Sequence, residues 1–184
     1  MDADRDEDTL IAQACRGDRQ AFGLLIRRLE PAVAAVSIAM LGHDGDAEDA
    51  GQETMIRLFH ALPAFRGQSS LRTFTTRIAV NIALDMLRRR RREAHGRQAF
   101  EHRTAAPAEP SVDPRGRLDR QRRIRTALQV LSPEHRAVIV LRLILGHSTA
   151  ETADLLSLPE GTVLSRLSRA RATLATSLKE MLDD

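Results

Sequence analysis

The sequence predicts an all-α protein built from two small helical domains joined by a flexible linker. Apolar residues recur at spacings of three and four in several long stretches, the period of a helix with one buried face. No stretch alternates between apolar and polar residues like a half-buried strand, and only 10 of the 184 residues are glycine. Hydrophobic residues make up 42% of the chain, enough to build cores. We expect domains over residues 8–92 and 117–182, with residues 93–116 as the linker.

The first domain is expected to contain three main helices. The first of them begins near Asp18, and the segment HDGDAED later interrupts the helical pattern. The second runs to about Leu62, with a buried face predicted at Gly51, Met55, Leu58 and Leu62. The segment PAFRGQSS is predicted to be a loop by its Pro, Gly and Ser content, and the third helix runs from about Leu71 into the arginine run at residues 88–92.

The linker and the second domain follow from composition and capping signals. Residues 93–116 contain several prolines and few large apolar side chains, as a mobile linker does. In the second domain one helix ends near Leu131, and Ser132 caps a helix that stops at Gly146. Ser148 and Glu151 form a capping box worth about 1 kcal/mol at the start of a short helix.

That short helix, a tight turn at residues 157–159 and a longer helix predict a helix-turn-helix, whose second helix enters the DNA major groove. Val163, Leu167, Ala170 and Leu174 share the buried face. At 100° per residue the outward face carries small side chains and one arginine, at Gly161, Ser165, Ser168, Arg169 and Ala172. Arg166 and Arg171 flank this face, where arginines can reach phosphates or a guanine edge. The same geometry also occurs as plain helix packing.

The helix over residues 46–62 carries carboxylates around an exposed isoleucine, which suggests a docking face for a basic helix. This face contains Asp46, Asp49, Glu53, Ile56, Arg57 and His60. A preference of acidic residues for helix N-termini accounts for Asp46 to Asp49, but not for Glu53 or Ile56. A metal site built from His43, Asp46, Asp49, Glu53 and His60 is a weaker alternative, because these residues lie on one convex face without a second wall.

Charge and cysteine content narrow the function further. The net charge is +3, and Lys179 is the only lysine among 28 basic residues. Arginine suits nucleic acid, although a GC-rich genome would also favour it. The lone Cys15 excludes an internal disulfide and a cysteine-based zinc site. The acidic N-terminus and an apolar run of only residues 32–41 predict a cytoplasmic protein without membrane insertion.

Three stretches together resemble bacterial sigma-70-family RNA polymerase sigma factors of the extracytoplasmic-function (ECF) class. They are DAEDAGQETMIRLFHALPAFRGQSSLRTF, RIAVNIALDMLRRRRR and LSPEHRAVIVLRLILGHSTAETADLLSLPEGTVLSRLSRARATL, in the family's order with a linker between the last two. The resemblance covers about residues 9–181 and implies a non-enzymatic initiation factor without cofactor or metal. Its implied partners are core RNA polymerase, promoter DNA and a separate anti-sigma factor.

The resemblance also assigns residues to three surfaces. It implies contact with the clamp helices of core polymerase through Asp46, Asp49, Gln52, Glu53 and Ile56. It implies capture of a flipped −10 base and binding of nearby phosphates by Gly67, Gln68, Ser69, Ser70, Arg77, Asn81, Arg88 and Arg89. It implies −35 recognition by Glu160, Gly161, Thr162, Ser165, Arg166, Arg169 and Arg171.

Three positions depart from the family pattern. Thr75 and Thr76 stand where aromatic residues are usual, which predicts weaker base stacking during melting. Leu164 replaces a common lysine and removes a phosphate contact, and Ser157 replaces a glycine at a turn that favours left-handed backbone.

Two other functions compete with initiation. A helix-turn-helix regulator would bind duplex DNA as a dimer without polymerase, but it leaves the acidic helix and the arginine run unexplained. A metal-dependent nuclease would use the acidic cluster and cleave DNA only with a divalent cation.

Overall fold

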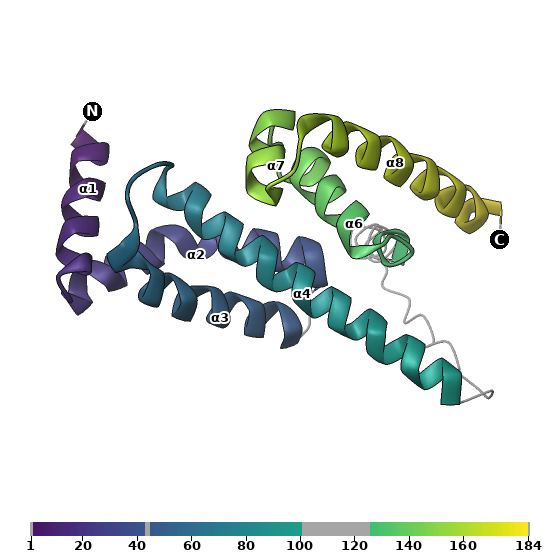
Figure 1. The fold of residues 1–184 in the computed structure, drawn as a ribbon, viewed down its shortest axis with the longest axis horizontal. Coiled ribbons are helices and arrows are strands. Elements are labelled where there is room, and N and C mark those ends of the chain that lie inside the picture. Colours follow the sequence, from purple (N-terminus) through teal and green to yellow (C-terminus); the bar gives the residue numbers. More distant parts are fainter. Residues whose placement is uncertain (1, 43–44, 101–125, 184) are drawn as a thin grey trace, which may run out of the picture.

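The computed structural model describes residues 2–42, 45–100 and 126–183, and these residues form helices and connecting turns without a strand (Figure 1). The expected all-α fold is therefore confirmed. The first domain contains α1 (Asp2–Cys15), α2 (Arg19–Leu41), α3 (Gly45–Ala61), the short 3₁₀ helix η1 (Leu62–Ala64) and α4 (Leu71–Phe100). The second contains α6 (Pro133–Ile139), the π-helical turn η2 (Val140–Ile144), α7 (Thr149–Leu156) and α8 (Glu160–Asp183).

Helices α2, α3 and α4 pack side by side to form the core of the first domain, and α1 packs against α2 at one end. Asp18 starts α2 as a cap: its Oδ1 accepts hydrogen bonds from the backbone N–H groups of Gln20 (2.8 Å) and Ala21 (3.1 Å). The buried face of α3 differs in part from the prediction. Leu58 and Leu62 are buried, but Gly51 and Met55 are half-buried, and the small residues Ala47, Ala50 and Thr54 are buried in their place. Small side chains let α3 lie close to its neighbours.

Helix α4 does not end at Arg92, where the first domain was predicted to stop. It continues to Phe100, into the segment predicted to be linker. Arg89 Nε donates a 2.8 Å hydrogen bond to Glu93 one helical turn later, a spacing that supports a helix. The rest of the predicted linker, residues 101–116, lies outside the described residues.

The caps of the second domain are present as predicted. The Ser132 hydroxyl accepts from the backbone N–H of His135 (3.3 Å) at the start of α6. In the capping box, Glu151 Oε2 accepts from Ser148 N (2.7 Å) and Ser148 Oγ accepts from Glu151 N (3.1 Å). The predicted single helix up to Gly146 instead widens into the π-helical turn η2, which leaves Leu143 and Ile144 both exposed.

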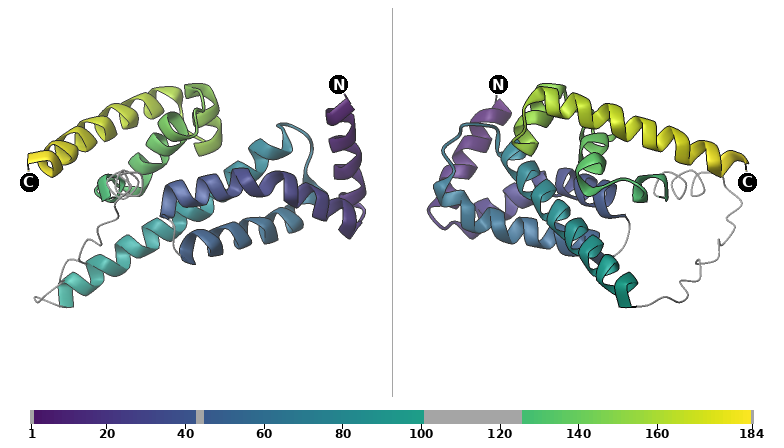
Figure 2. Two further views of the ribbon diagram at one scale, coloured as in Figure 1. Left: turned by 180° about the vertical axis from the view of Figure 1, so that it is seen from behind. Right: turned by 45° about the vertical axis from the view of Figure 1, so that its right-hand side comes forward.

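The second domain lies against the first (Figure 2). One apolar cluster contains Val36 and Met40 of α2, Val80 and Ala83 of α4 and, from the second domain, Ala137, Val140, Leu141 and Leu155. A separate cluster around Val138, Val163, Leu167 and Ala170 belongs to the second domain alone. The sequence predicted two separate units, so this shared core is a new feature of the structure.

Candidate protein-docking and nucleic-acid surfaces

The outer face of α3 presents the predicted docking residues, with one exception. Asp49, Gln52 and Ile56 are exposed, and Ile56 keeps 53% of its surface accessible. Glu53 lies on the same face and accepts a 2.7 Å hydrogen bond from Arg57 Nε. Asp46 is half-buried and forms an ion pair with Arg90 of α4. The structure therefore brings four of the predicted residues together on one face, whereas Asp46 points towards α4 of the same domain.

A groove with a cavity volume of about 460 Å³ runs between α3 and α2 beside this face. Its floor is apolar, and its polar groups are Gln52 and the carboxylates of Glu30 and Glu48. The remaining lining residues are Ile26, Val33, Ala34, Ile38, Ala47, Gly51 and Met55. Sequence reasoning missed this second wall, although Ile26, Glu30 and Ala34 recur every four residues on α2.

Two aromatic rings, one on α2 and one on α3, lie one helical turn beyond residues that line the groove. Phe22 precedes Ile26 by one helical turn on α2, and Phe59 follows Met55 by one turn on α3. Their rings meet edge to face with centroids 5.0 Å apart, and Phe59 remains 49% exposed. The groove and this ring pair form an extended apolar surface with acidic groups along it, which suits an amphipathic basic segment.

The loop before α4 holds the residues predicted to capture a base. Gly67 has φ +68°, a conformation that glycine adopts without strain, and Gln68 is exposed beside it. Ser69 is half-buried, and its hydroxyl donates to the carbonyl of Ser70 (3.4 Å). The hydroxyl of Ser70 accepts from the backbone N–H of Thr73 (3.1 Å). Ser70 therefore caps α4, and its side chain already has a structural task.

Helix α4 carries the remaining −10 residues. Asn81 is exposed, whereas Arg77 is half-buried, and its Nε is buried without a hydrogen-bond partner among the described residues. Thr75 and Thr76 are both buried, and Thr75 Oγ1 donates to the carbonyl of Leu71 (2.8 Å). Both threonine side chains therefore face the core and not the surface where a base could stack. The weaker stacking predicted from them assumed exposed side chains.

Several arginines in the second half of α4 make contacts within the chain. Arg89 pairs with Glu93, and this hydrogen bond raises the pKa of the Arg89 guanidinium. Arg90 pairs with Asp46, and Arg88 pairs with Glu134 of the second domain. DNA phosphates would therefore have to compete with carboxylates of the protein for these side chains.

The predicted reading face of α8 points to solvent. Glu160, Gly161, Ser165, Arg169 and Arg171 are exposed, whereas Thr162 and Arg166 are half-buried. Leu164 is 53% exposed on the same helix. Ser157 joins α7 to α8 in the left-handed conformation (φ 53°, ψ 48°), as predicted for a position where glycine is usual. A closely approaching groove would meet small side chains with arginines beside them.

The alternative metal site is not assembled among the residues that the structure describes. Within these residues, no group of three or more His, Cys, Asp or Glu side chains could hold a metal ion. Asp46 and Glu53 pair with arginines instead, and His43 lies outside the described residues. No described helix combines the length and the apolar character needed to cross a membrane.

The fold and these surfaces define a two-domain helical DNA-binding protein that carries a helix-turn-helix in its second domain. Two family models match it: Sigma-70 region 2 over residues 25–93, and Sigma-70 region 4 over residues 121–174. The chain belongs to the sigma-70 family of RNA polymerase sigma factors, in the ECF class. The predicted resemblance is thereby confirmed, and with it a role in transcription initiation.

Similar proteins cover nearly the whole chain. The ECF RNA polymerase sigma factor SigM of Mycobacterium tuberculosis (strain H37Rv) is 34% identical over 178 residues, 95% of this chain and 86% of that protein. The ECF RNA polymerase sigma-E factor of Salmonella typhimurium (strain LT2) is 30% identical over 190 residues, 96% of each chain.

Two solved structures share the fold. CnrH in complex with the cytosolic domain of CnrY has a TM-score of 0.66 at 30% identity, covering 95% of this chain and 98% of CnrH. The sigma factor RpoE of Bartonella quintana, in complex with the anti-sigma factor NepR, has a TM-score of 0.64 at 28% identity, covering 86% of this chain and 96% of RpoE.

Proposed function

We propose that the chain binds core RNA polymerase through the outer face of α3 and the adjoining groove, and promoter DNA through α4, its preceding loop and α8. The observation that carries this proposal is the combination of an acidic, partly apolar helix face in one domain with a helix-turn-helix in the other. Membership of the ECF class supports it. The polymerase carries out the catalysis, so the protein itself acts as a factor and not as an enzyme, and its place of action is the cytoplasm.

The docking surface suits a polymerase helix that is basic on one side and apolar on the other. Asp49 and Glu53 present carboxylates to such a helix, and Ile56 presents an apolar contact beside them. Glu30 and Glu48 add negative charge to the groove. Complementary charge speeds association and fixes the orientation of the partner, while the buried apolar contacts supply most of the affinity.

We assign the DNA contacts residue by residue. Gly67, Gln68 and Ser69 are proposed to hold a flipped −10 base together with Asn81, and Arg77 and Arg88 to contact phosphates. On α8, the small residues Gly161 and Ser165 permit close approach, and Arg169 reaches a base edge or phosphate of the −35 element. Residues 8–92 and 117–182 remain our proposed limits for the two binding units.

A separate anti-sigma factor is the remaining proposed partner. One solved relative is in complex with an anti-sigma factor. An inhibitor that covers the docking groove or the DNA-binding faces would block this chain. A duplex-DNA regulator that works without polymerase is disfavoured by family membership, and a nuclease by the acidic residues that pair with arginines.

Transcription in vitro with purified core polymerase and mapped transcript starts tests the proposal. Reversing the charges with Asp49→Arg and Glu53→Arg should abolish polymerase binding and all promoter-specific transcripts, while circular dichroism shows unchanged helicity. Arg169→Ala should leave polymerase binding intact and weaken −35 recognition by about 1–3 kcal/mol if the contact is bidentate to a base.

Asp154→Arg is the control, because Asp154 is an exposed acid on α7 away from the proposed docking face. Normal promoter-specific transcription by the charge-reversed protein at ordinary concentrations would show that the docking face is wrongly assigned.

A further inference from the structure

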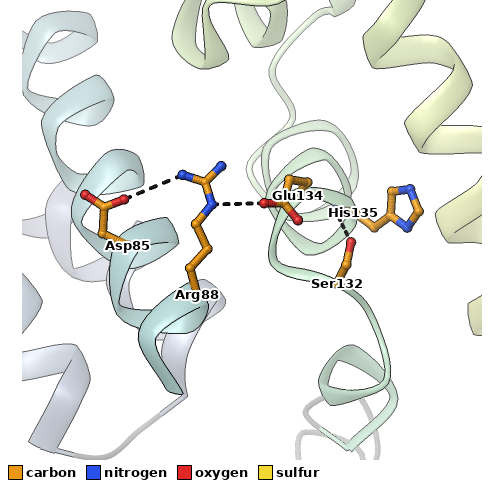
Figure 3. Close-up of polar contacts among 5 residues, drawn as sticks. All are labelled: Asp85, Arg88, Ser132, Glu134 and His135. Atoms are coloured by element: carbon orange, nitrogen blue, oxygen red, sulfur yellow. Dashed lines mark hydrogen bonds and ion pairs between the residues drawn. The ribbon is translucent and has the colours of Figure 1, made fainter. Parts of the chain in front are cut away.

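One ion pair joins the arginine-rich part of α4 to the first turn of α6. Arg88 Nε donates a 2.9 Å hydrogen bond to Glu134 Oε1, and Arg88 Nη1 lies 3.5 Å from Asp85 Oδ1 on its own helix (Figure 3). Ser132 caps the turn that carries Glu134 by accepting the backbone N–H of His135. The pair therefore links two residues that are 46 positions apart in the sequence and belong to different domains. Glu134 lies in a helix turn that Ser132 caps.

Arginines of α4 lie around Glu134. Arg88, Arg91 and Arg92 of α4 line an open cleft together with Pro133 and Glu134. Burial raises the pKa of the Glu134 carboxyl, but the hydrogen bond from Arg88, a backbone hydrogen bond and the charges of Arg88 and Arg166 bring it below its ordinary value. The cleft therefore places one carboxylate among three arginines of α4.

Other contacts across the same boundary oppose each other. The shared apolar cluster holds the domains together. Arg136 of α6 is buried and donates to the carbonyls of Leu128 (2.9 Å) and Met40 (3.1 Å). Burial lowers the pKa of Arg136, and the positive charge of Arg90 lowers it further. Burial of this cation costs hydration, and its two hydrogen bonds to carbonyls offset part of that cost.

We propose that Glu134 is an internal substitute for a DNA phosphate, which holds Arg88 so that the two domains stay closed until promoter DNA takes over this guanidinium group. Carboxylates and phosphates both accept hydrogen bonds from the planar guanidinium fork, so they compete for the same donors. The inference rests on the proposed function, because that function assigns Arg88 to DNA.

The distance between the domains tests the closing role without DNA. Spin labels at Gln20→Cys and Lys179→Cys, both exposed positions, report this distance in the full chain. The native thiol is removed with Cys15→Ser, which keeps a donor for the carbonyl of Leu62 that Cys15 Sγ contacts at 3.3 Å. Glu134→Gln should raise the ratio of open to closed molecules about two- to fivefold, the effect of one partly exposed ion pair.

Asp154→Asn makes the same charge change at an exposed site of α7 and should leave the distances unchanged. The effect of Glu134→Gln should also vanish in an Arg88→Gln background, because the partner is already missing. Identical distance distributions for the wild type and Glu134→Gln would overturn the closing role.

A second measurement tests the competition with DNA. Glu134→Gln should bind a labelled promoter duplex about two- to fivefold more tightly than the wild type, and this gain should be lost in the Arg88→Gln background. A variant that opens without gaining DNA affinity would overturn the phosphate-substitute role. If neither protein binds promoter DNA with or without polymerase, the proposed function fails as well, while the distance measurement still decides whether Glu134 closes the molecule.

Discussion

Ser157 shows how much a single backbone conformation matters in the helix-turn-helix. It is the only non-glycine residue with positive φ in the described part of the chain, and the N–H of Leu158 after it bonds the carbonyl of Ala153 (2.9 Å) to close the turn. A side chain in this region of φ and ψ costs about 1 kcal/mol, whereas glycine adopts it without that penalty. The turn that orients α8 therefore carries a small built-in strain.

Replacing Ser157 by glycine should stabilise the protein by about 0.5–1 kcal/mol, measured by urea or thermal unfolding. The matched control is Ser168→Gly in the middle of α8, which should cost about 0.5 kcal/mol because glycine is a poor helix former. A loss of stability in Ser157→Gly would show that the turn does not need the left-handed conformation.

At this scale, exposure was more predictable than contact. The outward positions of α8, such as Ser165 and Arg169, follow from helical spacing alone and are exposed. The pairing of Asp46 with Arg90 was not predictable, since it joins α3 to α4 and depends on how these helices pack. The roles assigned to these residues in binding remain predictions.

At the scale of helices, the groove between α2 and α3 offers a test through Gly51. A Cβ atom built at Gly51 meets no other atom within 4 Å, so a side chain here would extend into open space in the groove. Gly51→Ala should stabilise α3 by about 1 kcal/mol and still leave most of the groove open.

Gly51→Leu should fold equally well but occupy the groove, and we expect polymerase binding at least tenfold weaker than in Gly51→Ala, measured by titration with core enzyme. A tenfold loss is a change of about 1.4 kcal/mol in binding free energy. Equal affinities of the two variants would show that the partner does not enter the groove and contacts only the outer face of α3.

Helix positions were predictable because their signals are local. Asp18, Ser132 and Ser148 cap the helices that the sequence predicted for them. The extension of α4 to Phe100 was missed because the change in composition at Glu93 was interpreted as a linker. The π-helical turn at Val140–Ile144 was also missed, because its apolar spacing resembles that of an α-helix over so short a stretch.

At the scale of the whole molecule, the two domains were predicted correctly but their contact was not. Apolar spacing shows that Val140 and Leu155 are buried, but it does not show which element covers them. In the structure they pack against α2 and α4 as well as within their own domain. Such packing depends on long-range contacts that local sequence patterns do not encode.

The closed arrangement should depend on pH through Glu134. The charged groups around its carboxyl are four arginines and one acid. The arginines are Arg88, Arg91 and Arg92 of α4 and Arg166 of α8, and the acid is Asp85, which contacts Arg88. Because the pKa of Glu134 is lowered in the closed form, its contribution is complete above the ordinary glutamate pKa and is lost as the pH falls through the lowered value.

Acidification should therefore lengthen the distance between the spin labels in the wild type, and the same titration of Glu134→Gln should lack this step. Coincident pH profiles for the two proteins would assign the opening to another group.

The buried guanidinium of Arg136, in the second domain, hydrogen-bonds the last turn of α2 in the first domain. When the domains part, the last turn of α2 loses the donor at Met40, and this carbonyl turns to water for its hydrogen bond. At the same moment a cation regains the hydration that burial had denied it. Separation thus returns both groups to water, and amide protection around Met40 becomes a local measure of the long-range movement.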